Sequence, residues 1–155
     1  MAQILVVDDD PRIRNMLQRY LEGEGFAVQS VSNAKQAKLV LKQFTINLVL
    51  LDLRLGEDDG LDLLRDIRVD NKNTGVIILS GKTEVVDKIV GLELGADDYV
   101  TKPFNLRELH ARIKIVLKRF EAGSGAPDNV ASIIVDFGKW KLDLGRQYLE
   151  DEDQN

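Results

Sequence analysis

The chain has 155 residues, of which 44% are hydrophobic and 30% charged, and its formal net charge is -5 at neutral pH. It contains no cysteine and one histidine, which excludes disulfides, thiolate zinc sites, cysteine nucleophiles and histidine metal clusters. The negative charge argues against nucleic-acid binding by this chain unaided, and without a signal peptide or an apolar run of roughly 18 residues we expect a cytoplasmic protein that does not enter a membrane.

Short apolar runs alternate with helical periods along the first two thirds of the chain. The runs predict five strands, at residues 3–8, 26–31, 47–52, 75–80 and 97–100. Apolar residues at helical spacing predict a helix after each strand, beginning near Ile13, Ala34, Leu61, Val86 and Leu106. Strands and helices of these lengths indicate right-handed βαβ units. We therefore expect an α/β fold with a doubly wound, five-stranded parallel sheet, followed by a short β-strand segment.

The composition changes after Phe120, where residues 121–128 are small and polar. This pattern predicts a first domain at 1–121, an interdomain linker at 122–130 and a second segment at 131–155. Within that segment, residues 131–135 and 139–144 are strand-like. A few short strands cannot bury a core of their own, so we expect the opening of a second domain whose remainder is absent.

Charged and hydroxyl side chains stand where the predicted strands end. Asp8 and Asp9 follow the first strand, Asp52 closes the third, Ser80 closes the fourth and Lys102 follows the fifth. The carboxyl ends of parallel strands meet at one edge of a sheet, where open α/β folds bind ligands. Three carboxylates and one ammonium there predict a magnesium-dependent phosphate site, in which Asp52 can attack phosphorus.

Each of these residues also has an ordinary structural explanation. Asp10 precedes Pro11 and is interpreted as a helix cap. An acid after a strand, such as Asp52, and a lysine before proline, such as Lys102, are weak signals when taken singly. Capping does not explain two further acids at the first strand's end, because like charges raise one another's pKa. A divalent cation would relieve that repulsion.

Other motifs of phosphate chemistry are incomplete. Residues 81–83 (Gly-Lys-Thr) resemble the end of a P-loop, but Val76 stands where that motif needs glycine. A haloacid-dehalogenase-type phosphatase would carry a second aspartate two positions after the nucleophile, and Arg54 is there. The lone histidine, His110, lies in a predicted helix and is interpreted as a surface or dimer-face residue.

Four motifs in this order and spacing resemble the receiver domain of two-component response regulators, over residues 1 to about 120. They are ILVVDDD at 4–10, LLDLRL at 50–55, ILSG at 78–81 and GADDYVTKPF at 95–104. The last motif, with residues 105–109, is similar to the OmpR/PhoB-type transcription regulators. Residues 134–149 resemble the strand platform that precedes their winged helix. The resemblance implies a flavodoxin-like receiver fold.

The resemblance implies that Asp52 is the phosphoacceptor and that a sensor histidine kinase supplies the phosphate. It further implies that Asp8 and Asp9 form an acidic pocket, in which Asp9, Asp52 and the main-chain carbonyl of Arg54 bind Mg²⁺. Lys102 would pair with the phosphoryl group.

In the switch that the resemblance implies, Ser80 is drawn toward the phosphoryl group and Tyr99 turns inward. One departure from the family pattern is Gly56, where these regulators often have proline. The glycine leaves the rigidity of this loop open.

The resemblance also implies a two-fold homodimer through the fourth helix, fifth strand and fifth helix. The charges that match such an interface are Lys88 with Glu108, Asp98 with Arg112, and Asp97 with Arg119. As solvated surface pairs, each would contribute roughly 0.2–1 kcal/mol.

The sequence therefore predicts a response regulator whose phosphorylation switches dimerisation and, in the full-length protein, DNA binding and transcription. DNA would be bound only through a part that is missing after Asn155. The protein would catalyse its own phosphorylation and dephosphorylation without being an enzyme for an outside substrate. The alternatives are a receiver that acts only as a protein-binding module and, less favoured, a small magnesium-dependent phosphatase.

Overall fold

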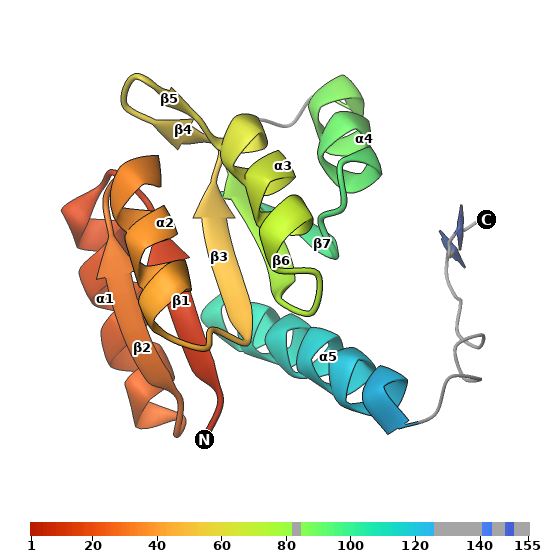
Figure 1. Ribbon diagram of the computed structural model, residues 1–155, viewed down its shortest axis with the longest axis horizontal. Coiled ribbons are helices and arrows are strands. Elements are labelled where there is room, and N and C mark those ends of the chain that lie inside the picture. The colour runs from red at the N-terminus through yellow and green to blue at the C-terminus, as the bar shows by residue number, and fades with distance from the viewer. Residues whose placement is uncertain (82–84, 126–140, 144–147, 151–155) are drawn as a thin grey trace. The chain divides into compact units, whose positions relative to one another are not determined.

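A five-stranded parallel sheet forms the centre of the unit Met1–Leu117 (Figure 1). This computed structural model describes residues 1–81, 85–125, 141–143 and 148–150. The strands of the sheet are β1 (Gln3–Val7), β2 (Ala27–Val31), β3 (Leu48–Asp52), β6 (Gly75–Ser80) and β7 (Asp98–Thr101). Their order, β2-β1-β3-β6-β7, is the flavodoxin-like order of a doubly wound sheet, which confirms the predicted fold class.

The strand register brings the predicted site residues to one edge. β1 pairs with β3 so that Val7 lies beside Leu51, which places Asp8 next to Asp52. β6 lies on the other side of β3, and its last residue, Ser80, pairs with Thr101 of β7. Residues that follow β1, β3 and β7 therefore gather at the carboxyl edge, as the sequence predicted.

In the ranges that the structure describes, five helices connect the strands or follow them: α1 (Pro11–Gly23), α2 (Ala34–Gln43), α3 (Gly60–Asp70), α4 (Val85–Glu93) and α5 (Leu106–Gly125). The Asp10 side chain accepts a hydrogen bond from the Arg12 N–H at 2.9 Å, which confirms its interpretation as the cap of α1. Gly25 and Gly95, which follow α1 and α4, have φ angles of 98° and 112°. This left-handed conformation suits glycine and ends both helices.

The sheet is covered on both faces. Alternate strand residues, such as Leu5 and Val49, join a core cluster that includes residues of α2 and α3. Successive strand residues point to opposite faces of the sheet. The strand residues between those of the core cluster therefore face the other layer, which contains α1 and α5 (Figure 1). The strands are buried on both faces and accordingly consist of continuous apolar runs.

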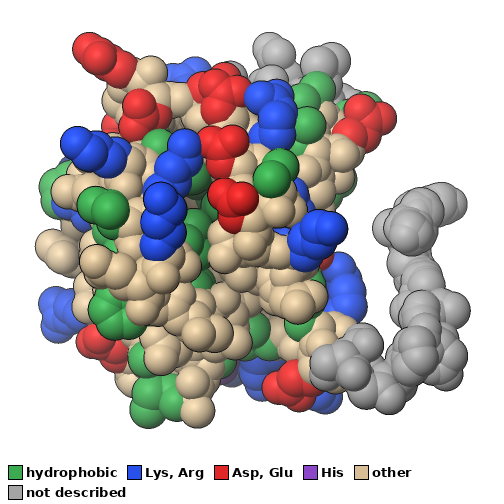
Figure 2. Space-filling view, viewed as in Figure 1, with side chains coloured by type: hydrophobic (Ala, Val, Ile, Leu, Met, Phe, Trp, Pro, Cys, Tyr) green, Lys and Arg blue, Asp and Glu red, His purple; other side chains and the backbone are tan. Residues whose placement is uncertain are grey.

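A small antiparallel hairpin follows β3 and was not predicted. It consists of β4 (Arg54–Leu55) and β5 (Asp58–Asp59), with Gly56 at φ 64° in the turn. Leu55 is buried, and the Asp58 Oδ2 atom accepts a hydrogen bond from the Ala34 N–H of α2 at 3.0 Å. Acidic side chains gather over this hairpin and α3 (Figure 2), and exposed acids there are Glu57, Asp58, Asp59 and Asp62. The hairpin is thus a charged surface element tied to the core and to α2.

His110 of α5 lies in the contact between α1 and α5. Its ring packs edge-on against Phe26 and Tyr20, with centroid distances of 5.7 and 6.2 Å. Its Nδ1 atom is 3.7 Å from the Glu24 Oε1 atom, and its side chain is 18% exposed. His110, interpreted as a surface or dimer-face residue, is thus only partly exposed. One aromatic neighbour comes from α1 and the other, Phe26, directly precedes β2, which helix periodicity does not reveal.

The second unit, Lys118–Asn155, contains the end of α5 and a hairpin of β8 (Lys141–Asp143) and β9 (Tyr148–Glu150). β8 falls within the strand-like stretch predicted at 139–144, whereas the stretch at 131–135 lies outside the described residues. α5 extends to Gly125, four residues into the predicted linker. Residues 122–125 contain no proline, so no ring opposes the helix in that stretch. Among the described residues, no helix has the length and apolar character needed to cross a membrane.

Candidate functional site

Three carboxylates meet in a cleft at the carboxyl edge of the sheet. Asp8 and Asp52 are buried and Asp9 is exposed, and each offers one oxygen to a group whose members lie within 4.8 Å of one another. The cleft has a volume of about 370 Å³ and is lined by Asp8, Asp9, Asp10, Asp52, Arg54, Gly81 and Lys102. The residues predicted from the ends of three separate strands therefore form one site.

Lys102 bridges two of these carboxylates. Its Nζ atom donates hydrogen bonds to the Asp8 Oδ2 atom at 2.9 Å and to the Asp52 Oδ2 atom at 3.1 Å. The lysine main chain is fixed as well, because its N–H donates to the Ser80 carbonyl at 2.8 Å. The ammonium is thus held where charge on a group bound to Asp52 would develop.

Burial and the opposite charge of the partner shift the pKa values of Asp52 and Lys102 in opposite directions. Burial raises the pKa of Asp52, and the negative charge of Asp8 adds to that rise, while the Arg54 N–H and Lys102 oppose it. Burial by itself lowers the pKa of Lys102, but the hydrogen bonds and charges of Asp8 and Asp52 outweigh it, so the pKa lies above its usual value. The ammonium therefore remains charged and favours ionisation of Asp52.

Main-chain groups orient the three acids. The Arg54 N–H donates to the Asp52 Oδ1 atom at 3.1 Å, the Asp10 N–H to the Asp8 Oδ1 atom at 2.9 Å and the Gly56 N–H to the Asp9 Oδ2 atom at 3.2 Å. These contacts could not be predicted from the sequence, because any residue except proline can supply a main-chain N–H donor.

Arg14 was also missed as a contributor to the site. Its Nη1 atom donates to the Asp8 carbonyl at 2.7 Å and so ties the turn after β1 to α1. Helical periodicity places Arg14 beside the buried face of α1, but this contact follows from the turn geometry rather than from a motif.

The two residues expected to form the switch do not line the cleft. Ser80 is buried at the end of β6, and its carbonyl holds the Lys102 main chain. Tyr99 is 6% exposed, and a Cβ atom placed on Gly91 would lie 3.7 Å from its ring, so the ring packs against α4. Tyr99 thus already occupies a buried position in this structure.

Several charges assigned to the dimer face already have partners within the chain. The Arg112 Nη1 atom lies 2.8 Å from the Asp98 Oδ2 atom, and its Nη2 atom lies 3.0 Å from the Glu108 Oε2 atom. The charge of Asp98 is the main cause that raises the pKa of Arg112 above its ordinary value. Asp97 contacts the Arg68 Nη2 atom at 2.8 Å.

The remaining charges of the predicted dimer face, Lys88 and Arg119, are exposed. Arg119 belongs to the second unit of the chain.

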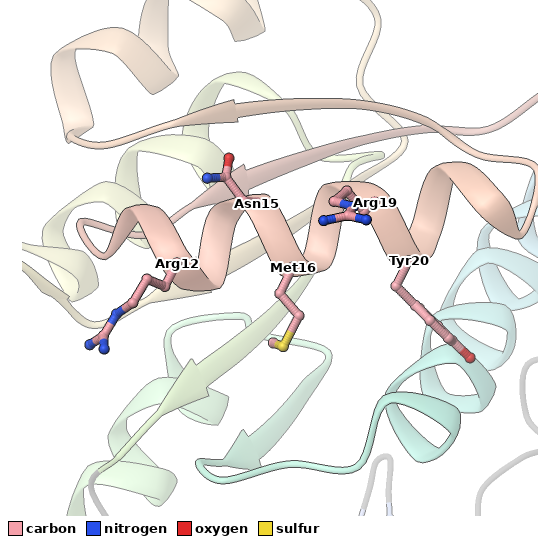
Figure 3. A pocket seen from close by; sticks show the side chains of 5 residues that line it. All are labelled: Arg12, Asn15, Met16, Arg19 and Tyr20. Carbon is pink, nitrogen blue, oxygen red and sulfur yellow. The ribbon is translucent and has the colours of Figure 1, made fainter.

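A second hollow runs along α1 (Figure 3). This shallow groove of about 650 Å³ is lined by Arg12, Asn15, Met16, Arg19 and Tyr20. Its lining contains no carboxylate, so the groove lacks the acidic residues that the sequence predicts for phosphate chemistry.

The donor set of the cleft fits magnesium. Magnesium prefers oxygen ligands and is typically held by one or two carboxylates together with a phosphate oxygen. Asp8, Asp9 and Asp52 supply carboxylate oxygens, and the described part of the chain offers no thiolate, while its one imidazole lies in the α1–α5 contact.

Asp52→Asn is expected to raise the free energy of unfolding in magnesium-free buffer. Because burial raises the pKa of Asp52 above 3.8, the folded state binds more protons than the unfolded chain in that range, and stability falls as pH rises through it. Asparagine does not titrate, so the gain over wild type should grow between about pH 4 and pH 8. Urea unfolding at both pH values measures it, and an equal gain at the two would contradict this explanation.

Comparisons with known proteins agree with this geometry. Residues 4–114 match the family model of the response regulator receiver domain. The chain is 43% identical over 160 residues to the transcriptional regulatory protein AruR of Pseudomonas aeruginosa, covering 100% of this chain and 65% of AruR. It is 35% identical over 147 residues to the TorCAD operon transcriptional regulatory protein TorR of Escherichia coli, covering 95% of this chain and 64% of TorR. The chain thus spans slightly less than two thirds of the length of these relatives.

Solved structures of receiver domains have the same fold. The receiver domain of the TMAO respiratory system response regulator TorR superposes with a TM-score of 0.73 at 38% identity, covering 77% of this chain and 99% of that one. A CheY-like receiver domain protein from Methanospirillum hungatei gives a TM-score of 0.75 at 30% identity, covering 78% and 97%. The resemblance inferred from the four motifs is confirmed. The chain belongs to the response regulator receiver domain family of two-component systems, and its matched relatives are transcriptional regulators.

Proposed function

We propose that this chain is a phosphorylation switch in which Asp52 accepts a phosphoryl group from a sensor histidine kinase. The observation that carries the proposal is the position of Asp52 at the end of β3, 3.1 Å from the Lys102 ammonium and beside two further carboxylates. A nucleophile, a fixed cation and a set of oxygen ligands are the parts that phosphoryl transfer needs.

In the proposed transfer, a carboxylate oxygen of Asp52 forms the new bond to phosphorus. The bond between phosphorus and the imidazole nitrogen of the kinase breaks, and its electron pair stays on that nitrogen. Lys102, held by Asp8 and Asp52, offsets negative charge on the phosphoryl oxygens without having to move into place. The chain would have no turnover on an outside substrate, and its chemistry would be limited to its own phosphorylation and dephosphorylation.

Asp8, Asp9, Asp52 and the main-chain carbonyl of Arg54 are the groups that would hold magnesium. When bound, magnesium would offset negative charge on the oxygens of the phosphoryl group. The carboxylates supply the hard oxygen ligands that this ion prefers, and their close approach is itself eased by a divalent cation.

The output of the switch would pass through Ser80 and Tyr99 to a homodimer interface formed by α4, β7 and α5. Ser80 adjoins the site through Lys102, and Tyr99 packs against α4, so the two residues link the cleft to that face. The proposed intersubunit pairs are Lys88 with Glu108, Asp98 with Arg112, and Asp97 with Arg119. Asp98, Arg112 and Asp97 already have partners within the chain, so dimerisation would replace contacts within the chain by contacts between subunits. The intersubunit pairs would therefore determine the orientation of the two subunits more than their affinity.

The activity of the whole protein is likewise a proposal. With a receiver at 1–121, a linker at 122–130 and the strand platform of a winged helix at 131–155, the full-length protein would bind DNA and regulate transcription in the cytoplasm. The names of the matched relatives, which are transcriptional regulators, support this assignment.

The test is the intact mass of the protein after incubation with magnesium and a small-molecule phosphodonor. We expect a gain of one phosphoryl group that needs magnesium and is abolished in Asp52→Asn. The matched control is Asp62→Asn, which removes an exposed carboxylate of α3 and should leave the gain unchanged. An equal gain in Asp52→Asn, or no gain in the wild type, would contradict the proposal and favour a protein-binding module.

A further inference from the structure

The turn of the β4–β5 hairpin contacts a carboxylate of the acidic cleft. The Gly56 N–H donates a hydrogen bond to the Asp9 Oδ2 atom at 3.2 Å, across 47 positions of the sequence. Asp9 is exposed, so without a fixed donor its side chain would sample several rotamers in water. The contact thus holds the one acid of the site that burial does not hold.

The hairpin itself is firmly placed, so its N–H group is a fixed donor. Leu55 is 2% exposed within the core cluster. On the other strand, the Asp58 Oδ2 atom accepts from the Ala34 N–H at 3.0 Å, at the start of α2. Gly56 lies between these two anchors, which fix the turn without any help from Asp9.

The geometry with this bond in place suits metal binding. One oxygen of Asp9 lies within 4.8 Å of oxygens of Asp8 and Asp52. A carboxylate has about four lone-pair sites, so Asp9 can accept the N–H and still serve as a ligand. Hydrogen bonds of this kind orient metal ligands in other proteins, and their loss typically weakens metal binding by about 10–100-fold.

Only certain residues at position 56 can make this contact. Gly56 has a φ angle of 64°, in the left-handed region, and unlike proline it has a main-chain N–H. Proline has no N–H and holds φ near −65°, so it can supply neither feature. The contact with Asp9 therefore depends on the residue at position 56.

We propose that the main-chain N–H of Gly56 is a positioning group for Asp9, which makes the magnesium affinity of this chain depend on the residue at position 56. The inference rests on the proposed function, because it concerns the same metal site. It goes further by assigning a role to a residue outside the predicted site.

The test compares the magnesium dissociation constants of Gly56→Pro and Gly56→Asn by titration calorimetry on the unphosphorylated protein. We expect about 10-fold weaker binding in Gly56→Pro. Gly56→Asn should stay within about twofold of wild type, because asparagine keeps the N–H and tolerates φ above zero, and no heavy atom lies within 4 Å of the added Cβ.

A merely structural effect is distinguished by two further measurements. Loosening of the turn alone would lower the metal-free melting temperature and leave the affinity of the folded protein unchanged. In metal-free protein, Asp9→Ala should speed hydrogen exchange of the Gly56 amide roughly fivefold, as expected for the loss of one net hydrogen bond.

Failure of this inference is separable from failure of the proposed function. Equal magnesium affinity in Gly56→Pro and wild type, or equal losses in Gly56→Pro and Gly56→Asn, would overturn the role of Gly56 while the phosphorylation chemistry stands. A wild-type chain that binds no magnesium at millimolar concentration would overturn both.

Discussion

Gly60→Ala is expected to lower the free energy of unfolding by about 3 kcal/mol. A Cβ atom on Gly60 would lie 2.6 Å from the Asp52 carbonyl oxygen and 2.6 Å from the Leu53 Cα atom. Ordinary contacts between carbon atoms are roughly 3.5–4.0 Å, and main-chain atoms cannot rotate away as a side chain would. The first turn of α3 would have to move from the end of β3, and the Gly60 N–H would lose its 3.0 Å bond to the Leu53 carbonyl.

The same displacement should reduce phosphorylation, because the main chain of Asp52 is the part that is pushed. Urea unfolding measures the stability, and intact mass measures the phosphoryl gain. Gly23→Ala is the matched control: nothing lies within 4 Å of its added Cβ, and alanine at the end of α1 should stabilise by roughly 0.5–1 kcal/mol. If Gly60→Ala were as stable as wild type, the close approach of α3 to β3 would be incorrect.

Arg68→Met is expected to destabilise the fold by about 3 kcal/mol. The guanidinium donates to the Gly95 carbonyl at 2.7 Å, the Thr74 carbonyl at 2.6 Å and the Asp97 Oδ2 atom at 2.8 Å. The Arg68 and Asp97 side chains are 19% and 15% exposed, so solvent replaces little of what is lost. Methionine keeps part of the stem and removes the charge and all three bonds.

Arg65→Met serves as the control on the same helix. Arg65 pairs with Asp62 at 3.0 Å, but the two side chains are 58% and 66% exposed, so its loss should change stability by less than about 0.5 kcal/mol. Denaturant unfolding of both variants makes the comparison. Adding Asp97→Asn to Arg68→Met should recover part of the loss, since it removes the buried charge that lost its cation. If Arg68→Met and Arg65→Met lowered stability equally, the contacts of Arg68 would stabilise the fold no more than an exposed ion pair does, contrary to this prediction.

The parallel strands and the acids that follow them were predictable because burial on both faces leaves a visible apolar run. Asp8 and Asp52 could be placed together from the sequence, because adjacent parallel strands end at the same edge. Lys102 could be placed at the same edge by the same argument, because it comes directly after the last strand of the sheet. The switch roles of Ser80 and Tyr99 had no such basis and came only from the resemblance.

Other features leave no local pattern. The strands of the β4–β5 hairpin have two residues each, which is too short for any alternation to be detected. Arg68 and Asp97 are 29 positions apart, and nothing near either residue indicates the other. Asp97 was instead assigned to an intersubunit pair with Arg119, because the family resemblance implied a dimer through this face.

The packing of His110 between α1 and α5 gives this chain a built-in spectroscopic probe. Because it is the only imidazole in 155 residues, its ring protons give isolated signals in a proton magnetic resonance spectrum. The rings of Phe26 and Tyr20, 5.7 and 6.2 Å away, make those signals sensitive to small shifts of one helix against the other. Addition of magnesium and a phosphodonor would then report, without any label, how far a change at Asp52 travels toward the helices on the other face of the sheet.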